Sequence, residues 1–310
     1  MKNTIRMMSL FAAAAAIVCA TGCMFSAKAF DHSDEYTAGD FSTNSEVKAL
    51  DIDWTSGSVT VSHHDQSDVT VTETYNGSLK DAQKLQTWLE GSTLHIRYCK
   101  SGFNFNLKNP QKHLEIKLPE GVELDSLKCD CTSADTSFSE ISADSFEVDI
   151  TSGTLLFDDC TADKFNIDST SGDITVNQKG SSETMKVEST SGKINITADT
   201  VRKLNVHSTS GDTEIHANKA ESVSAKSTSG VEIMYFGAVP SSADINTTSG
   251  DVSLYLPKNA DFAAVVDTCS GKFNSDISCS KDGDTYTAGS GANQFRIETT
   301  SGDIALRSND

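Results

Sequence analysis

A Thr-Ser-Gly turn that returns at nearly constant intervals is the feature that most limits how this chain can fold. From Ala134, which stands in a degenerate copy, to Gly271, successive turns are 19, 19, 20, 19, 19, 20 and 21 residues apart. A unit this short cannot bury an apolar face by itself, whereas stacked units can. The predicted structural turn glycines of this series and of its final copy are Gly153, Gly172, Gly192, Gly211, Gly230, Gly250, Gly271 and Gly302.

Apolar and polar residues alternate on both sides of each turn. Ile167, Val187 and Val206 each stand five residues before a turn glycine, and Ile194 and Ile196 follow a glycine by two and four residues. Period-two alternation indicates strands with one buried face. Because the same offsets recur, the buried faces should stack into one core. We therefore predict an all-β protein, a β-solenoid whose coils of about 19–20 residues are spaced about 4.8 Å apart. A sandwich is disfavoured because its strands are not spaced identically over so many copies.

The residues of the turn have separate predicted roles. Glycine provides a corner conformation that a β-carbon would penalise, and the hydroxyls bond the local backbone. The following residue is Asp in alternate copies, as at Asp173 and Asp212, with Lys193 between them. Carboxylates one coil apart would repel by roughly 1 kcal/mol in water, so we interpret the alternation as a charge ladder. A calcium-binding ladder would concentrate carboxylates instead. We predict no metal site and no cofactor.

Two stretches depart from the repeat. Residues 78–90 place several apolar side chains on one helical face, with Ser78 and Asp81 as a capping pair and Gly91 as a stop. The apolar residues are Leu79, Ala82, Leu85, Trp88 and Leu89. We therefore predict a short helical insertion at about 76–92, which covers the first coil. The second stretch, 274–293, predicts a loop or hairpin near the other end.

The first residues are typical of an export signal. Lys2 and Arg6 precede a short apolar run, and the segment from Ala20 to Cys23 resembles the bacterial lipobox. We predict a lipoprotein signal peptide over 1–22, lipid attachment at Cys23, a linker over 23–45 and the solenoid domain over 46–307. The alternative is cleavage after Ala29, which would release a secreted protein. No other stretch approaches the roughly 18 apolar residues of a membrane-spanning helix.

Eight cysteines are too many to remain reduced outside a cell, which indicates disulfides. Cys269 and Cys279 lie ten residues apart across a Gly- and Ser-bearing stretch and are the predicted pair. Four further cysteines allow three pairings, which spacing does not decide: Cys99, Cys129, Cys131 and Cys160. A zinc site is disfavoured because no Cys-x-x-Cys pair or His cluster accompanies them.

The pattern resembles the bacterial "putative adhesin" domain family. The similarity covers about residues 46–307. It is carried by Ile116-Lys117-Leu118-Pro119, by the Thr-Ser-Gly-Asp turns, by Leu254-Tyr255-Leu256-Pro257, and by Gly289-Ser290-Gly291 leading to Thr300-Ser301-Gly302-Asp303. The resemblance implies a β-solenoid at the cell envelope. It brings neither an agreed activity nor binding residues.

The net charge of the chain and its lack of known catalytic motifs disfavour several classes of function. The net charge is -19, from 44 acidic and 25 basic residues, which argues against a nucleic-acid partner. The chain has no His-Glu-x-x-His, Gly-x-Ser-x-Gly or phosphate-loop motif, and we predict no catalytic residues and no enzyme. The first hypothesis is an adhesin-like protein that binds a surface polymer or an envelope protein and is held to the membrane by its lipid. The alternatives are a lipoprotein of envelope homeostasis or sensing without an external ligand, and a carbohydrate-active β-helix enzyme.

Overall fold

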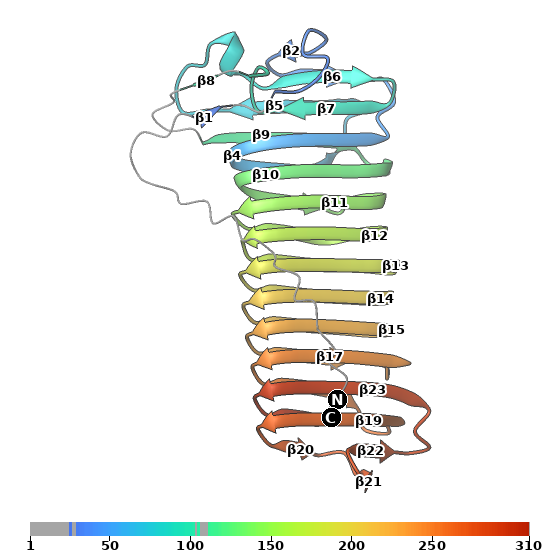
Figure 1. The fold of residues 1–310 in the computed structure, drawn as a ribbon. Coiled ribbons are helices and arrows are strands. Elements are labelled where there is room, and N and C mark those ends of the chain that lie inside the picture. The colour runs from blue at the N-terminus through green and yellow to red at the C-terminus, as the bar shows by residue number, and fades with distance from the viewer. Residues whose placement is uncertain (1–24, 27–28, 103, 106–110, 310) are drawn as a thin grey trace, which may run out of the picture.

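Parallel strands wind into a long stack of coils (Figure 1). The computed structural model describes residues 25–26, 29–102, 104–105 and 111–309. Most long strands begin just after one corner glycine and end just before the next. The central strands are β10 (Glu123–Ser139), β11 (Ser142–Ser152), β12 (Leu155–Ser171), β13 (Ile174–Ser191), β14 (Ile194–Ser210), β15 (Thr213–Ser229), β16 (Glu232–Phe236), β17 (Ser242–Ser249) and β18 (Val252–Pro257). The predicted β-solenoid is confirmed.

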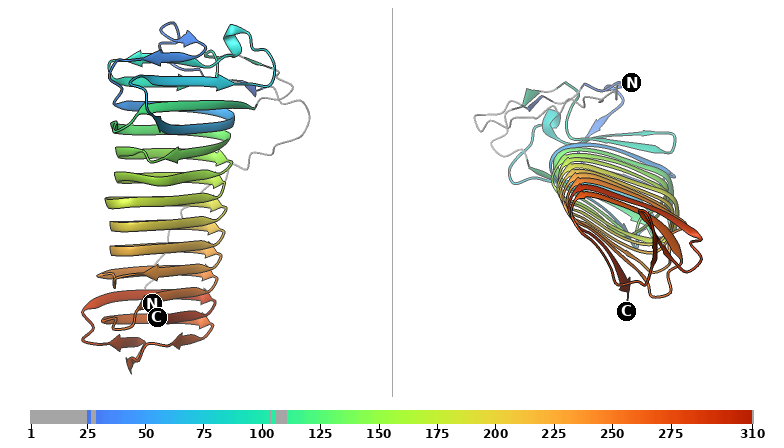
Figure 2. Two further views of the ribbon diagram at one scale, coloured as in Figure 1. Left: turned by 180° about the vertical axis from the view of Figure 1, so that it is seen from behind. Right: turned by 60° about the horizontal axis from the view of Figure 1, so that its bottom comes forward.

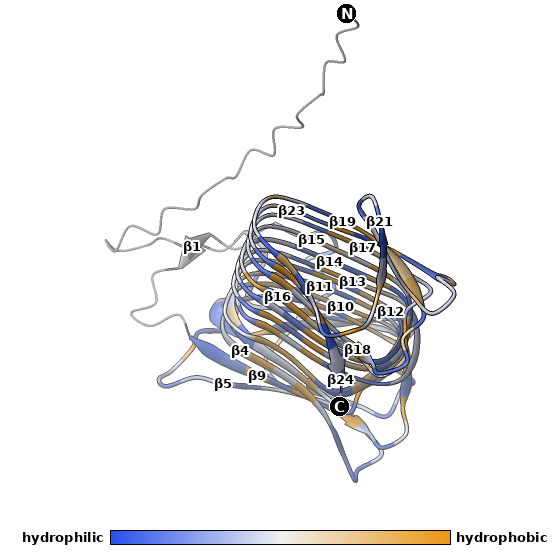
Figure 3. Ribbon diagram, turned by 90° about the horizontal axis from the view of Figure 1, so that it is seen from below, coloured by the Kyte–Doolittle hydropathy of each residue, from blue (hydrophilic) through white to orange (hydrophobic). Residues whose placement is uncertain are grey.

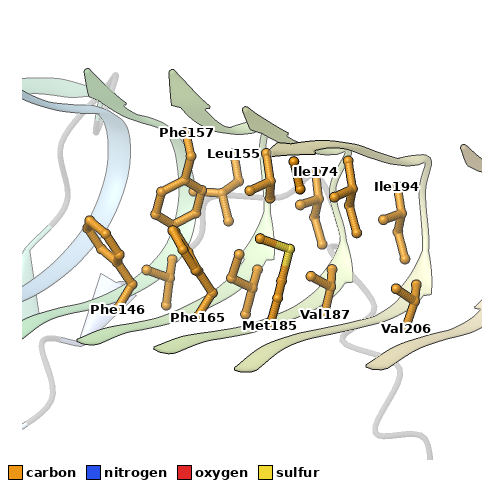
Figure 4. Packing of buried hydrophobic residues seen from close by; sticks show 14 of the residues in the cluster. Phe146, Leu155, Phe157, Phe165, Ile174, Met185, Val187, Ile194 and Val206 are labelled. Atoms are coloured by element: carbon orange, nitrogen blue, oxygen red, sulfur yellow. The ribbon is translucent and has the colours of Figure 1, made fainter. Parts of the chain in front are cut away.

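The core is a set of side-chain columns that run along the stack. Ile167 pairs with Val187, and Val187 pairs with Val206, as vertical neighbours on β12, β13 and β14. All three are almost fully buried. Figure 4 shows Val187 and Val206 facing Ile174 and Ile194 across the interior of the coil. Figure 3, which looks along the stack, shows the coils superposed, with hydropathy alternating along their strands. The predicted common core is therefore confirmed.

At the C-terminal end, the order of coils in space differs from their order in the chain. The strands are β19 (Phe262–Ser270), β20 (Phe273–Ser275), β21 (Ser280–Asp282), β22 (Thr285–Ala288), β23 (Asn293–Ser301) and β24 (Ile304–Asn309). β23 pairs with β17 on one side and with β19 on the other, and β24 lies between β18 and β20 in the same way. The last coil of the chain is thus inserted between two earlier ones (Figure 1).

The irregular stretch before this inserted coil forms the predicted hairpin. β21 pairs antiparallel with β22, and β22 pairs antiparallel with β19 at the bottom of the stack. Asp261 holds the turn that leads back into β23: its Oδ1 accepts the backbone N–H groups of Gly291 at 2.6 Å and Ala292 at 3.0 Å, and its Oδ2 accepts the Ser290 hydroxyl at 2.6 Å. These hydrogen bonds lower the pKa of Asp261.

The N-terminal end is capped by antiparallel strands. The elements are β2 (Thr37–Ala38), β3 (Phe41–Thr43), β4 (Ala49–His64), β5 (Val69–Thr74), β6 (Gln86–Glu90), β7 (Thr93–Arg97) and β9 (Lys112–Pro119), with β1 (Phe25–Ser26) pairing with β8 (Asn104–Phe105). β7 and β9 together form a coil that stacks on β4, on the side away from β10. β6 and β5 then pair antiparallel with β7 and β9 and cover the outer edge (Figure 2).

The helix predicted over residues 78–90 is wrong. The segment contains only a 3-10 turn, η1 (Asp81–Gln83), followed by strand β6. Trp88 and Leu89 pair with His95 and Leu94 across a two-residue turn that begins at Gly91, where φ is +60°. Sheet pairing at the open edge of the solenoid outweighs the helical periodicity of a short segment, because isolated helices of this length are marginal.

A buried ion pair joins the cap to the first coil. The Lys112 side chain is fully buried, and its ammonium contacts the Glu73 carboxylate and donates to the Gln83 carbonyl at 2.9 Å. It also lies 3.9 Å from the ring centroid of Tyr98 and 5.0 Å from that of Trp54. Burial lowers the pKa of Lys112 and raises the pKa of Glu73 despite their pairing. This cluster ties together segments that are distant in the sequence.

Part of the predicted 23–45 linker belongs to the cap. β2 pairs with β6, and β3 pairs with β5. Tyr36 lies with its ring centroid 5.6 Å from that of Trp88 and 4.7 Å from that of Phe30, and the Arg97 guanidinium lies 5.9 Å from the Tyr36 ring. The folded unit therefore begins before residue 46.

Candidate functional site

The structural turn glycines form one column along a corner of the stack. A β-carbon on Gly211 would lie 2.0 Å from the carbonyl oxygen of Gly192, and one on Gly250 would lie 1.8 Å from that of Gly230. The corresponding contact is within 2.4 Å at all eight predicted positions. Glycine is therefore required at this corner because the backbone of the neighbouring coil approaches too closely for any side chain.

The aspartates after the glycines hold neighbouring corners together. Asp173 Oδ1 accepts the backbone N–H of Lys193 at 2.8 Å, and Asp212 Oδ1 accepts that of Val231 at 3.0 Å. Asp135 makes the same bond to Thr154 at 2.9 Å. Each carboxylate thus satisfies a backbone donor in the next coil. The structure thus adds a backbone role for Asp173 to the predicted alternation of charges, and no ion pair between the side chains of Asp173 and Lys193 is found in the described residues.

An acidic column follows one outer face of the stack. It consists of the residues four positions before the corner: Asp53, Asp130, Asp149, Asp168 and Glu188. Each is the direct cross-strand neighbour of the next. Sequence reasoning missed this column, although its constant offset from the turn makes it visible in the sequence. Within the described residues, no group of three or more His, Cys, Asp or Glu side chains is arranged to hold a metal ion.

Protonation differs along the acidic column. Burial and the hydrogen bond shared with Glu188 raise the pKa of Asp168 to about 6. Burial and the neighbouring Asp130 raise the pKa of Asp149. Lys186 partly compensates, since its ammonium lies 3.0 Å from Glu188 and 3.9 Å from Asp168. Burial would raise the pKa of Glu188, but its hydrogen bonds with Lys186 and Asp168 lower it. The ionised carboxylates of the column would repel anionic polymers.

An aromatic ladder lies on the outer face formed by the strands that follow the corner. His216, Tyr235 and Tyr255 stand five residues after their glycines and are direct cross-strand neighbours. The ring centroids are 4.4 Å apart between His216 and Tyr235 and 4.2 Å apart between Tyr235 and Tyr255, and both pairs are nearly parallel. Because the ring faces cover one another, the ladder presents ring edges to solvent. This surface was not predicted from the sequence.

Apolar side chains adjoin the ladder on β16 and at the residue just before this strand. Val231 is 37 % exposed, and Ile233 and Tyr235 are partly exposed. On the next strand, Ser253 is the cross-strand neighbour of Ile233. We call His216, Tyr235, Tyr255, Val231 and Ile233 the aromatic patch. The carboxylate of Glu214 borders this patch, because Glu214 Oε1 lies 2.8 Å from His216 Nε2 and Glu214 is the cross-strand neighbour of Ile233.

One family sequence profile matches nearly the whole repeat region. The sequence profile described as Toastrack DUF4097 matches residues 47–236 and again 232–307. The chain belongs to the Toastrack family. The resemblance drawn from the Thr-Ser-Gly-Asp turns is thereby confirmed at the level of the family. A search of the curated proteins gives no match.

Several solved structures are similar to this Toastrack chain. A putative lipid binding protein from Parabacteroides distasonis ATCC 8503 is 17 % identical with a TM-score of 0.49, covering 86 % of this chain and 96 % of that one. A putative adhesin from the same organism is 14 % identical with a TM-score of 0.45, covering 87 % and 96 %. A putative adhesin from Bacteroides fragilis NCTC 9343 is 14 % identical with a TM-score of 0.40, also covering 87 % and 96 %.

The cysteines of the Toastrack chain lie in different surroundings. Cys269 is exposed and Cys279 partly buried, and both are free thiols in the structure, so their disulfide stays a prediction. The remaining described cysteines are also free and are buried, and burial raises the pKa of Cys99 to about 11 and that of Cys160 to about 12. Cys129 and Cys131 have their sulfur atoms 3.6 Å apart. Cys23 lies outside the described residues.

One shallow hollow lies at the return turns of the Toastrack stack. Its lining includes Glu183, Arg202, Lys219 and Glu221. Arg202 forms an ion pair with Glu183, and this contact lowers the pKa of Glu183. A solvent-exposed ion pair of this kind contributes little to stability. In the part of the chain that the structure describes, no helix is both long and apolar enough to cross a membrane.

Proposed function

We propose that this Toastrack chain is a non-catalytic protein of the cell surface that binds an uncharged polymer or envelope protein through the aromatic patch. The observation that carries the proposal is the patch itself, in which stacked, partly exposed rings and apolar side chains gather on one face of a chain of net charge -19, with Glu214 at the border. Exposed apolar side chains that gather in one place mark interaction sites more often than scattered ones do. The acidic column would repel anionic partners.

The stack supplies a rigid support for such a patch. Coils from β10 to β18 pair in register apart from irregularities at the return turns of β12 and β13, and their core is continuous. The patch lies on β15, β16 and β18, far along the stack from the N-terminal cap (Figure 1). If Cys23 carries a lipid, the cap is the end nearest the membrane, and the patch is held away from it.

The binding test uses paired variants of the purified chain. Immobilised neutral glycans, anionic glycans and envelope proteins are probed with the wild type and with Tyr235→Ser/Tyr255→Ser. We expect binding to an uncharged ligand that falls at least tenfold in the double variant. Lys226→Ser, on the face of the acidic column, is the matched control and should bind as the wild type does. Binding unchanged in the double variant, or binding to no ligand, would contradict the proposal and favour an envelope role without an external ligand.

Anchoring is tested separately. We propose that Cys23 is the lipid attachment site, and Cys23→Ala should move the protein from the membrane fraction to the soluble fraction. Mass spectrometry of the mature N-terminus distinguishes this from cleavage after Ala29. Membrane retention of the Cys23→Ala protein would contradict lipidation without affecting the binding proposal.

A further inference from the structure

Glu232 occupies a core position of the repeat. It stands two residues after Gly230, where other coils place Leu155, Ile174 and Ile194. Its side chain points inward, and the residue is 2 % exposed. Its cross-strand neighbours are Thr213 on β15 and Val252 on β18. A carboxyl group therefore replaces an aliphatic side chain within an otherwise apolar column.

Two polar atoms at this position have no partner. Glu232 Oε2 and Thr213 Oγ1 are both buried and lack a hydrogen bond of standard geometry within the described structure, although Thr213 lies close enough to act on the carboxyl group. Ser227, which also approaches the carboxyl group, donates its hydroxyl to Thr247 Oγ1 at 2.8 Å. Buried polar groups in native proteins almost always have a partner, so this pair of orphans requires an explanation.

The charges around Glu232 do not favour an ionised carboxylate. None of the ion pairs found in the described residues includes Glu232, and the charged group that acts on it is the carboxylate of Asp212 in the preceding coil. The uncharged groups that face it are Thr213, Ser227 and the aliphatic Val252. Burial strongly disfavours an isolated ionised carboxylate, whereas a neutral carboxylic acid can donate a hydrogen bond.

We propose that Glu232 is a neutral carboxylic acid in the folded stack of coils. Its proton forms a hydrogen bond between Glu232 Oε2 and Thr213 Oγ1, and ionisation of Glu232 loosens the surrounding coils. A proton on Oε2 makes Glu232 a donor, and Thr213 Oγ1 is the acceptor on the adjacent strand. One proton thus satisfies both oxygens. A hydrogen bond donated by Thr213 to an ionised carboxylate would satisfy the same two oxygens, but burial and the Asp212 carboxylate disfavour that charge. The device makes the stability of this part of the rod depend on the pH outside the cell.

The direction of the effect follows from linkage. Burial, partly offset by Ser227 and Thr213, raises the pKa of Glu232 to about 7, from an ordinary value of 4.5. Because the folded state holds a proton that the unfolded state has lost, stability falls as pH rises from about 4.5 to about 7. Above that range both states are ionised, and the contribution of this group stops changing.

The experiment compares the full purified chain with Glu232→Gln from pH 4.5 to pH 9. Urea unfolding gives the ratio of their unfolding constants, and this ratio removes the effects of the other carboxyl groups. We expect the wild-type constant to rise relative to the variant by up to tenfold per pH unit below pH 7 and to level off above it. Glu221→Gln, at an exposed glutamate on the neighbouring strand β15, is the control, and its ratio should stay flat.

Local hydrogen exchange provides a second measurement that does not require global unfolding to be two-state. Hydrogen exchange of β15 and β16, corrected for the intrinsic rate, should become faster in the wild type between pH 5 and pH 8 and remain unchanged in Glu232→Gln. Glu232→Val, which restores the aliphatic column, should behave like Glu232→Gln. Equal pH profiles for the wild type and both variants would overturn the proposal.

Discussion

Asp251 accepts the backbone N–H of Asp303 at 2.8 Å, although 52 residues separate the two in the chain. Asp303 in turn accepts the backbone N–H of Lys272 at 2.8 Å. The last coil of the sequence is therefore inserted between two earlier coils and uses the same corner chemistry as its neighbours. The insertion leaves β19 and the hairpin at the end of the stack.

The aspartates that follow the corner glycines should stabilise the fold because their side-chain oxygen accepts a backbone hydrogen bond from the next coil. Asp212→Ala removes the acceptor for the Val231 N–H, and we expect a loss of about 1 kcal/mol in the free energy of unfolding. Asp212→Asn keeps an oxygen in place and should cost much less. Urea unfolding of the two variants at neutral pH makes the comparison. Equal losses would show that the charge matters more than the hydrogen bond.

The corner glycines should be far more sensitive to a methyl group than other glycines with positive φ. Gly211 has φ +136°, and an added β-carbon would lie 2.0 Å from the Gly192 carbonyl oxygen, so Gly211→Ala should cost about 3 kcal/mol or more. Gly283 has φ +58° and no atom within 4 Å of an added β-carbon. Gly283→Ala should cost only about 1 kcal/mol. Thermal or urea unfolding measures both, and similar losses would refute the close-approach explanation.

The buried ion pair of the cap should show strong coupling. Lys112→Met leaves the Glu73 carboxylate buried without its partner, and we expect a loss of about 3–5 kcal/mol. Glu73→Gln in the same background keeps an acceptor for the Leu85 N–H and removes the unpaired charge, so the double variant should recover much of the loss. A double-mutant cycle in urea gives the coupling free energy. Additive effects of the two substitutions would contradict the pairing.

The acidic column should lower stability at neutral pH. The raised pKa of Asp168, about 6, means that its contribution to stability is lost as pH rises from about 4 to 6. Asp168→Asn should therefore stabilise the protein at pH 7, by about 0.5 kcal/mol after solvent screening, and the gain should vanish near pH 4. Exposed Asp163→Asn is the control. A gain independent of pH would mean that charge repulsion in the column is not the cause.

The repeat could be predicted from the sequence because the pattern that defines each coil lies within a few residues of its turn glycine. The offsets of Ile167, Val187 and Val206 from their glycines define both the buried face and the register, and parallel stacking follows from the constant spacing. The acidic column and Glu232 are visible in the same way, as residues at a fixed offset from the turn. They were missed because the search followed apolar residues and the turn itself.

The ends were less predictable because they depend on pairing across long sequence distances. Residues 78–90 have helical periodicity, but the strand edge of β7 binds Trp88 and Leu89 as a strand. The apolar residues around Gly302 have the same spacing from the glycine as in other coils, so the sequence predicts their register. No local pattern indicates which coils lie next to this one in space. The aromatic patch likewise requires knowing which strands are neighbours.

Cross-linking across the inserted coil tests the stacking most directly. Asn246 and Glu298 are cross-strand neighbours in the structure, whereas stacking in chain order would place Asn246 beside Asp267. Parallel neighbours about 4.8 Å apart are within disulfide range. We predict that Asn246→Cys/Glu298→Cys forms an intramolecular disulfide, identified by peptide mass mapping, and that Asn246→Cys/Asp267→Cys does not. A disulfide in the second pair and none in the first would contradict the arrangement of coils described for this protein.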